Sequence, residues 1–75
     1  MDVVVRPIGV RGTEWGLADR RGRPLGKIWR ARVFEVYPDP NSRLQGVESL
    51  HASLDKAMTA IARHMGGACQ LESRY

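Results

Sequence analysis

The chain has 75 residues, a single cysteine and a formal net charge of +4, which is enough for one small domain with a small core. One cysteine allows neither an intramolecular disulfide nor a cysteine-rich zinc site, and this favours a reducing, cytoplasmic setting. The first residues lack a basic start, a long apolar run and a small-residue cleavage site, so neither a signal peptide nor a membrane span is expected.

The positive charge is concentrated in the first half of the chain. Residues 1–32 hold eight basic and three acidic side chains, whereas residues 33–75 hold four basic and five acidic ones. A basic surface of this kind attracts polyanions, because each arginine placed near a phosphate releases a condensed counterion. A solvated basic face without a ligand would produce the same asymmetry.

The N-terminal segment is expected to lie at an edge of the fold. Residues 3–8 are rich in valine and isoleucine, which favour a strand. Pro7 interrupts this pattern because it has no N–H group to donate to a neighbouring strand. Residues 1–12 are therefore predicted to form an edge strand or a loosely anchored arm.

The next segment predicts a strand followed by a hairpin turn. Trp15 and Leu17 share one face of a strand at 14–19 because they are two residues apart. Gly22 can adopt a positive φ and Pro24 fixes the exit of the turn, so the chain is expected to reverse direction here.

Residues 25–37 have a strand-like composition throughout, but a single strand of this length would span about 40 Å, too long for so small a domain. An unbroken strand would also place Arg30 and Arg32 on the same face as the apolar Ile28. A bulge or turn between the two arginines removes both problems. The predicted strands are therefore 25–30 and 32–37.

The helix is the segment with the strongest local signals. Ser53 can accept a hydrogen bond from the first turn, Asp55 is favoured there by the helix dipole, and Gly66 supplies a left-handed stop. The apolar residues between these ends fall on one stripe of a helix at about 54–65. They are Leu54, Ala57, Met58, Ile61, Ala62 and Met65.

Three segments around the helix have weaker signals. Residues 38–43 are rich in turn-forming residues and predict a surface loop. Residues 44–51 can return as a short strand before the helix. Residues 66–75 are expected to form a short strand or a tail.

Together these elements predict a single α+β domain over residues 1–75, with an antiparallel meander of three to four strands and one α-helix packed on one face. The helix is expected to cover apolar residues of the sheet, namely Leu17, Ile28, Phe34, Val36 and Leu50. The other sheet face would then be exposed, with several arginines and one tryptophan.

The candidate nucleic-acid-binding residues are basic side chains of the hairpin and the strands around it: Arg20, Arg21, Arg23, Lys27, Arg30 and Arg32. Residues 21–24 also match the Arg-Gly-Arg-Pro core of the AT-hook, which binds the minor groove, but a hairpin turn is the favoured interpretation. An arginine-rich hairpin tip could contact phosphate without reading the base sequence.

Other side chains that could carry chemistry leave alternatives open. Trp15 and Trp29 could stack on bases if exposed on a basic sheet face, although core packing is the commoner role of tryptophan. His51, His64 and Cys69 could suggest nucleophilic or metal chemistry. No orienting acid, nucleophile elbow, i,i+4 histidine pair or glycine-rich phosphate loop accompanies them. We therefore predict no enzymatic activity, no metal site and no cofactor.

A resemblance to known DNA-binding folds covers about residues 14–65. It rests on Trp15-Gly16 in an early strand, Leu44-Gln45-Gly46 before the helix, and Ser53-Leu54-Asp55-Lys56-Ala57 at the helix start. This order of elements resembles the three-strand-plus-helix DNA-binding domains of plant ethylene-response factors and of phage integrase arm-binding modules. The resemblance implies a sheet that enters the major groove and a helix that braces it from behind. The Asp-x-x-Gly-Arg-Pro-Leu-Gly turn at 19–26 is also similar to a phrase in small uncharacterised bacterial and prophage proteins.

The sequence thus predicts a small, non-enzymatic bacterial or phage module that binds nucleic acid, DNA or RNA, through a basic sheet face and a hairpin tip. The alternative is a protein–protein interaction or accessory module, including a homodimer, with no nucleic-acid role. A small core and an open sheet edge would favour that alternative.

Overall fold

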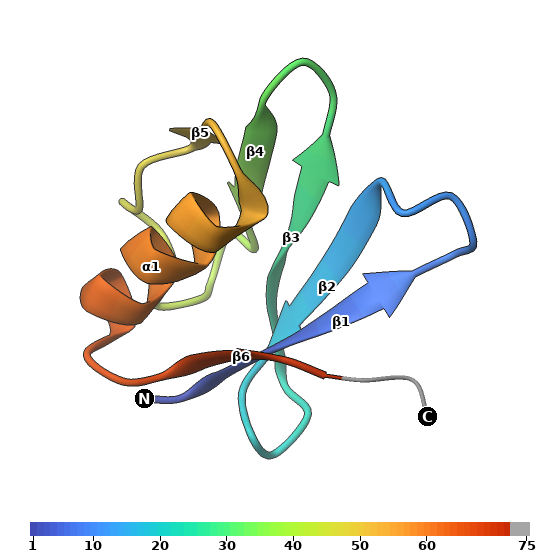
Figure 1. Ribbon diagram of the computed structural model, residues 1–75. Helices are drawn as coiled ribbons and strands as arrows, with labels where there is room; N and C mark the ends of the chain where they lie inside the picture. The colour runs from blue at the N-terminus through green and yellow to red at the C-terminus, as the bar shows by residue number, and fades with distance from the viewer. Residues whose placement is uncertain (73–75) are drawn as a thin grey trace.

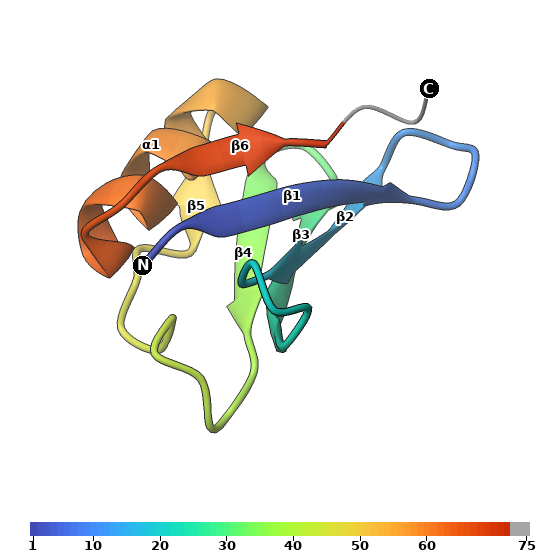
Figure 2. The same ribbon diagram turned by 90° about the horizontal axis from the view of Figure 1, so that it is seen from below.

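The protein is described here by a computed structural model in which residues 1–72 are placed. Over these residues it is an α+β fold with one helix and a curled sheet of six strands in the order β5-β4-β3-β2-β1-β6 (Figures 1 and 2). The elements in chain order are β1 (Val3–Ile8), β2 (Glu14–Ala18), β3 (Pro24–Arg30), β4 (Phe34–Pro38), β5 (Leu50–His51), α1 (Leu54–Met65) and β6 (Cys69–Leu71).

The prediction of an antiparallel meander of three to four strands was wrong in two respects: within residues 1–72 the sheet has six strands, and one of its strand pairs is parallel. Strands β1 to β5 pair antiparallel in sequence order, but β6 returns after the helix and pairs parallel to β1. This pairing joins residues 3–5 to residues 69–71. Two parallel strands must be joined by a long crossover, which here comprises everything from β2 to α1. The pairing of β1 with β6 therefore has no local signal in the sequence.

The N-terminal segment is an interior strand, so the expected edge strand or loose arm was wrong at residues 3–5. Val3 and Val5 are buried in the core, and β1 lies between β2 and β6. Pro7 is accommodated because it lies past the three residues of β1 that pair with β6. Pro7 in the second half of β1 therefore does not prevent residues 3–5 from pairing with strands on both sides.

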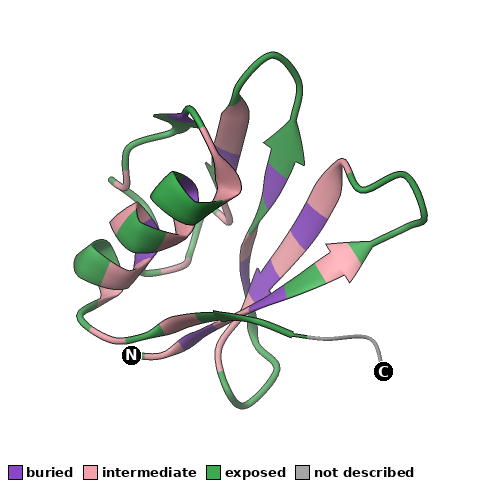
Figure 3. Ribbon diagram, viewed as in Figure 1, coloured by how far each residue is buried: buried purple, intermediate pink, exposed green. Residues whose placement is uncertain are grey.

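The helix begins and ends where its local signals predict. Ser53 Oγ accepts a hydrogen bond of 3.1 Å from the backbone N–H of Lys56, and Gly66 ends the helix with φ +69°. The helix covers one face of the sheet (Figure 1) and buries Ala57 and Ile61 against it. Figure 3 shows that buried residues follow this interface between helix and sheet.

A β-bulge in β3 decides which side chains face the helix. Leu17 of β2 pairs with Gly26, but Ala18 pairs with Pro24, so Leu25 is the extra residue. The bulge lets Leu25 and Ile28 both point into the core although they are three residues apart. It also leaves Lys27 on the opposite face.

The predicted division of residues 25–37 into two strands is confirmed, with small shifts at the boundaries. A turn over residues 31–33 separates β3 from β4, and Arg30 pairs with Phe34 across it. Arg32 lies in this turn and Arg30 at the end of β3, so neither arginine is buried. The two arginines therefore do not enter the core on the face of Ile28, as they would in an unbroken strand.

The segment between β4 and the helix differs from the expected strand at 44–51. Only Leu50 and His51 form a strand, and their orientation is reversed: Leu50 is 55% exposed, whereas His51 is buried. Leu44, in the loop, is fully buried. At the C-terminal end, where a short strand or a tail was expected, residues 69–71 form the strand β6, while residues 73–75 lie outside the described residues.

Candidate nucleic-acid interface

The turn between β2 and β3, residues 20–23, carries three arginines and is here called the arginine tip. Asp19 organises this turn, because its Oδ1 accepts hydrogen bonds of 2.9 Å from the backbone N–H groups of both Arg21 and Arg23. The backbone N–H of Gly22 donates to the carbonyl of Asp19, and Gly22 has φ +85°. The arginine side chains are thus presented on an ordered turn at one end of the sheet (Figure 1).

One arginine of the tip is tied back to the N-terminal segment. Arg20 Nε lies 3.2 Å from Asp2 Oδ2, while Asp2 Oδ1 accepts a hydrogen bond from the backbone N–H of Ala68. That hydrogen bond and the nearby Arg20 lower the pKa of Asp2. The resulting stabilisation is present above the usual aspartate pKa of 3.8 and is lost as pH falls through the lowered value. Within the described residues, Arg21 and Arg23 form no ion pair.

The structure divides the six predicted nucleic-acid-binding residues into three places. Arg20, Arg21 and Arg23 meet in the arginine tip. Lys27 lies in the middle of β3, and Arg30 and Arg32 lie at the far end of that strand. The seven residues of β3 separate the two ends by about 20 Å. A single chain therefore presents two basic ends rather than one continuous basic surface.

The sheet face away from the helix is uncovered, and cross-strand pairing arranges its side chains in two neighbouring rows. The first, here called the basic row, contains Arg6, Gly16, Lys27 and Tyr37. The second, here called the acidic row, contains Ile8, Glu14, Trp29 and Glu35. The rows point away from the helix because their neighbours along each strand are core residues. Sequence reasoning expected arginines on this face but missed the two glutamates.

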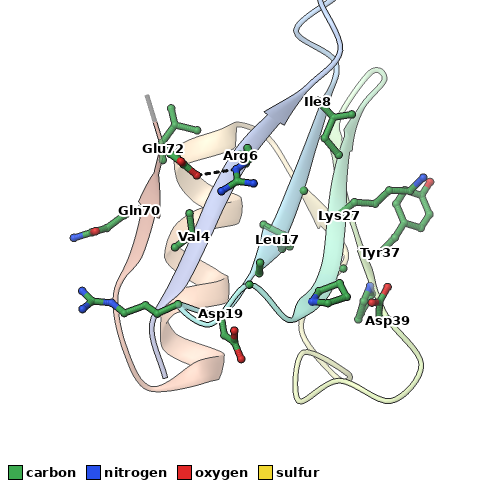
Figure 4. A pocket seen from close by; sticks show the side chains of 18 residues that line it. Val4, Arg6, Ile8, Leu17, Asp19, Lys27, Tyr37, Asp39, Gln70 and Glu72 are labelled. Carbon is green, nitrogen blue, oxygen red and sulfur yellow. Dashed lines mark hydrogen bonds and ion pairs between the residues drawn. The ribbon is translucent and has the colours of Figure 1, made fainter. Parts of the chain in front are cut away.

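An open groove of about 840 Å³ crosses this face (Figure 4). Its lining includes the small residues Gly16 and Ala18. Lys27 and Tyr37 lie along one side of it. At the other side Arg6 Nε donates to Glu72 Oε2 at 2.8 Å, an ion pair that raises the pKa of Arg6. Sequence reasoning did not predict this groove, since it depends on which strands flank the glycine in β2.

The two tryptophans have different roles. Trp15 is buried, with its ring centroid 5.8 Å from that of Phe34. Trp29 is 39% exposed on the uncovered face, where it pairs across the strands with Glu14 on one side and Glu35 on the other. Tyr37 Oη donates to Glu35 Oε2 at 2.8 Å, which raises the pKa of Tyr37. Because both neighbours of Trp29 are carboxylates, its surroundings disfavour a phosphate.

The histidines act as braces for the loop before the helix. His51 Nε2 lies 2.6 Å from the carbonyl oxygen of Glu48, and His64 Nε2 lies 3.0 Å from that of Arg43. His64, near the C-terminal end of α1, thus connects the helix to this loop. No cluster of three or more histidine, cysteine or acidic side chains suited to a metal ion occurs in residues 1–72.

Cys69 should react slowly with thiol reagents, because partial burial raises its pKa to about 11. At pH 8 only about one thiol in a thousand would be ionised, against roughly a quarter for an unperturbed cysteine. We expect modification by a disulfide reagent at pH 8 to be about 100-fold slower in the folded chain than in urea. The rate should rise with pH up to about 11. Equal rates in the folded and unfolded chains would contradict this assignment.

Comparisons of the chain with protein-family models, with curated proteins and with solved structures found no match. The resemblance to three-strand-plus-helix DNA-binding domains therefore stays a prediction. Among the described residues, no helix has both the length and the apolar character that crossing a membrane would require.

Proposed function

We propose that this protein is a small, non-enzymatic nucleic-acid-binding module that contacts the phosphate backbone through its arginine tip. The observation that carries the proposal is the ordered turn at residues 19–23, where Asp19 fixes the backbone and leaves three arginine side chains exposed. Arginine forms charge-assisted hydrogen bonds with phosphate, and an ordered turn loses less entropy on binding than a flexible one.

The contacts expected at the tip are positioning contacts. Arg21 and Arg23 are free of ion pairs within the described residues, so neither must break one to reach a phosphate. Lys27 lies on the adjoining uncovered sheet face rather than in the tip, so it is not counted among these contacts. Such contacts give strongly salt-dependent binding with little sequence preference.

The test is the salt dependence of binding in a pair of charge-matched variants. Binding to short duplex DNA, single-stranded DNA and RNA would be followed by fluorescence anisotropy between about 20 and 200 mM salt. In the variant Arg21→Gln with Arg23→Gln, two lost duplex phosphate contacts should reduce the slope of log K against log salt by about 2. The affinity at low salt should fall at least tenfold.

The control removes the same charge from the opposite layer. The variant Lys56→Gln with Arg63→Gln changes two exposed residues of α1, away from the tip. It should keep most of the slope and affinity of the unmodified chain. If both variants lose affinity and slope to the same extent, binding depends on the net charge of the chain and the arginine tip is not the binding site. If the unmodified chain shows no salt-dependent binding to any of the three nucleic acids, the proposed function is wrong.

A further inference from the structure

The uncovered sheet face combines exposed apolar groups with charges of both signs. Ile8, Trp29 and Tyr37 are large side chains exposed on it, at 46%, 39% and 45%. Helix α1 occupies the other face (Figure 1). Grouped aromatic and aliphatic side chains on one face are typical of surfaces that bind another protein.

The charges on this face are arranged in opposite rows. Glu14 and Glu35 lie in the acidic row, and within residues 1–72 neither forms an ion pair. Lys27, in the neighbouring basic row, also forms none there. A purely acidic or purely basic partner would match one row and be repelled by the other. A surface with the same two rows, in reverse order, would match both.

We propose that the uncovered faces of two copies of this chain pack against each other about a two-fold axis that lies between the sheets and runs across the strands. Such an axis reverses the strand direction, so the acidic row of each copy lies over the basic row of the other. An isologous interface requires this kind of self-complementary pattern. The inference does not depend on the arginine tip binding nucleic acid.

This arrangement brings specific groups together. Trp29 of each copy lies over Lys27 of the other, where an ammonium group and an indole face attract each other. Glu35 of each copy comes beside the same lysine. The groove above Gly16 provides room for Glu14 of the other copy, which faces it in this arrangement. The whole molecule extends 28 by 27 by 20 Å along its principal axes, so the uncovered face can bury at most about the 800 Å² that each partner contributes to a standard interface.

The same two-fold axis would bring together two groups of basic residues that lie at opposite ends of β3 in one chain. Reversal of the strand direction places the arginine tip of one copy at the same end of the dimer as Arg30 and Arg32 of the other. Each end of the dimer would then present a composite basic surface from both copies. The sequence analysis grouped the arginines of the tip with Arg30 and Arg32 in one candidate site. In the proposed dimer they would lie close together, although in one chain they do not.

The test is a charge swap read by sedimentation velocity and by light scattering after size-exclusion chromatography. The unmodified chain should be a dimer at micromolar to millimolar concentrations. Lys27→Glu and Glu35→Lys should each weaken dimerisation at least tenfold, because each places like charges opposite one another. The double variant carrying both changes restores the opposite-charge contact between positions 27 and 35 but not the contact of Lys27 with Trp29, so it should recover dimerisation in part. An equimolar mixture of the two single variants should form heterodimers.

Lys56→Glu makes the same charge change on the exposed side of α1 and should leave the dimer intact, and circular dichroism should show that every variant is folded. A monomer at every concentration would overturn the proposal. So would a dimer that survives both single variants, or one that the double variant fails to restore. Nucleic-acid binding is measured separately, so failure of one proposal does not imply failure of the other.

Discussion

Replacing Gly26 by alanine should destabilise the fold by about 3 kcal/mol or more, by the combined cost of backbone strain and overpacking. Gly26 has φ +154° in the β-bulge, and a Cβ atom there would collide with the carbonyl oxygen of Tyr37. It would also lie 2.9 Å from Pro38 Cα. Both obstacles are backbone atoms of β4, the strand paired with this part of β3, so neither can move away without breaking the sheet.

Gly22→Ala is the matched control for this prediction. Gly22 also has a positive φ, +85°, but apart from Gly22 itself and its two chain neighbours no residue has an atom within 4 Å of the position that its Cβ would occupy. Its substitution should therefore cost only the left-handed backbone term, about 1–2 kcal/mol. Urea unfolding followed by circular dichroism measures both losses. If Gly26→Ala costs no more than Gly22→Ala, the close approach of β4 to Gly26 is not a constraint on the fold.

The bulge at Leu25 and Gly26 also links stability to the proposed interface. With Leu25 as the extra residue, Lys27 and Trp29 face away from the core while Ile28 faces into it. A variant that loses the bulge would have to shift the register of β3 by one residue, and this would turn every later side chain to the other face. Loss of the bulge should therefore also abolish the two rows of the uncovered face.

Some elements could be predicted because their signals are local. The helix is specified at both ends by Ser53 and Gly66 and along its length by an apolar stripe, all within 14 residues of sequence. The turn at 19–23 is similarly local, since Asp19 and Gly22 form its hydrogen bonds within the turn itself. These two segments were placed correctly without knowledge of what packs against them.

Other features could not be predicted because they depend on pairing between distant residues. The parallel contact of β1 with β6 brings Val3 beside Cys69, and only this contact turns an expected edge strand into an interior one. The acidic row depends on the register of three strands, which places Trp29 between Glu14 and Glu35. Sequence reasoning expected arginines and one tryptophan on the uncovered sheet face, and it missed that Glu14 and Glu35 lie on the same face.

Leu44→Ala should cost about 2–5 kcal/mol, the range for truncation of a fully buried leucine, whereas Leu50→Ala should cost less than about 1 kcal/mol. Leu44 has no exposed surface, although it lies in an irregular loop. Its position is fixed from both sides: Ser42 Oγ donates to the carbonyl of Leu25 at 2.8 Å, and His64 Nε2 lies against the carbonyl oxygen of Arg43. Leu50, which the sequence assigned to the core, is 55% exposed.

The pair of leucine variants therefore compares two identical truncations that differ in burial. Both remove the same side-chain atoms within six residues of each other, so composition and charge stay matched. Urea unfolding at fixed protein concentration gives both free energies, and a concentration series separates any contribution from dimerisation. Equal losses, or a larger loss for Leu50→Ala, would mean that the loop does not insert Leu44 between helix and sheet. A loss confined to Leu44→Ala would show that the loop of residues 39–49 supplies part of the core.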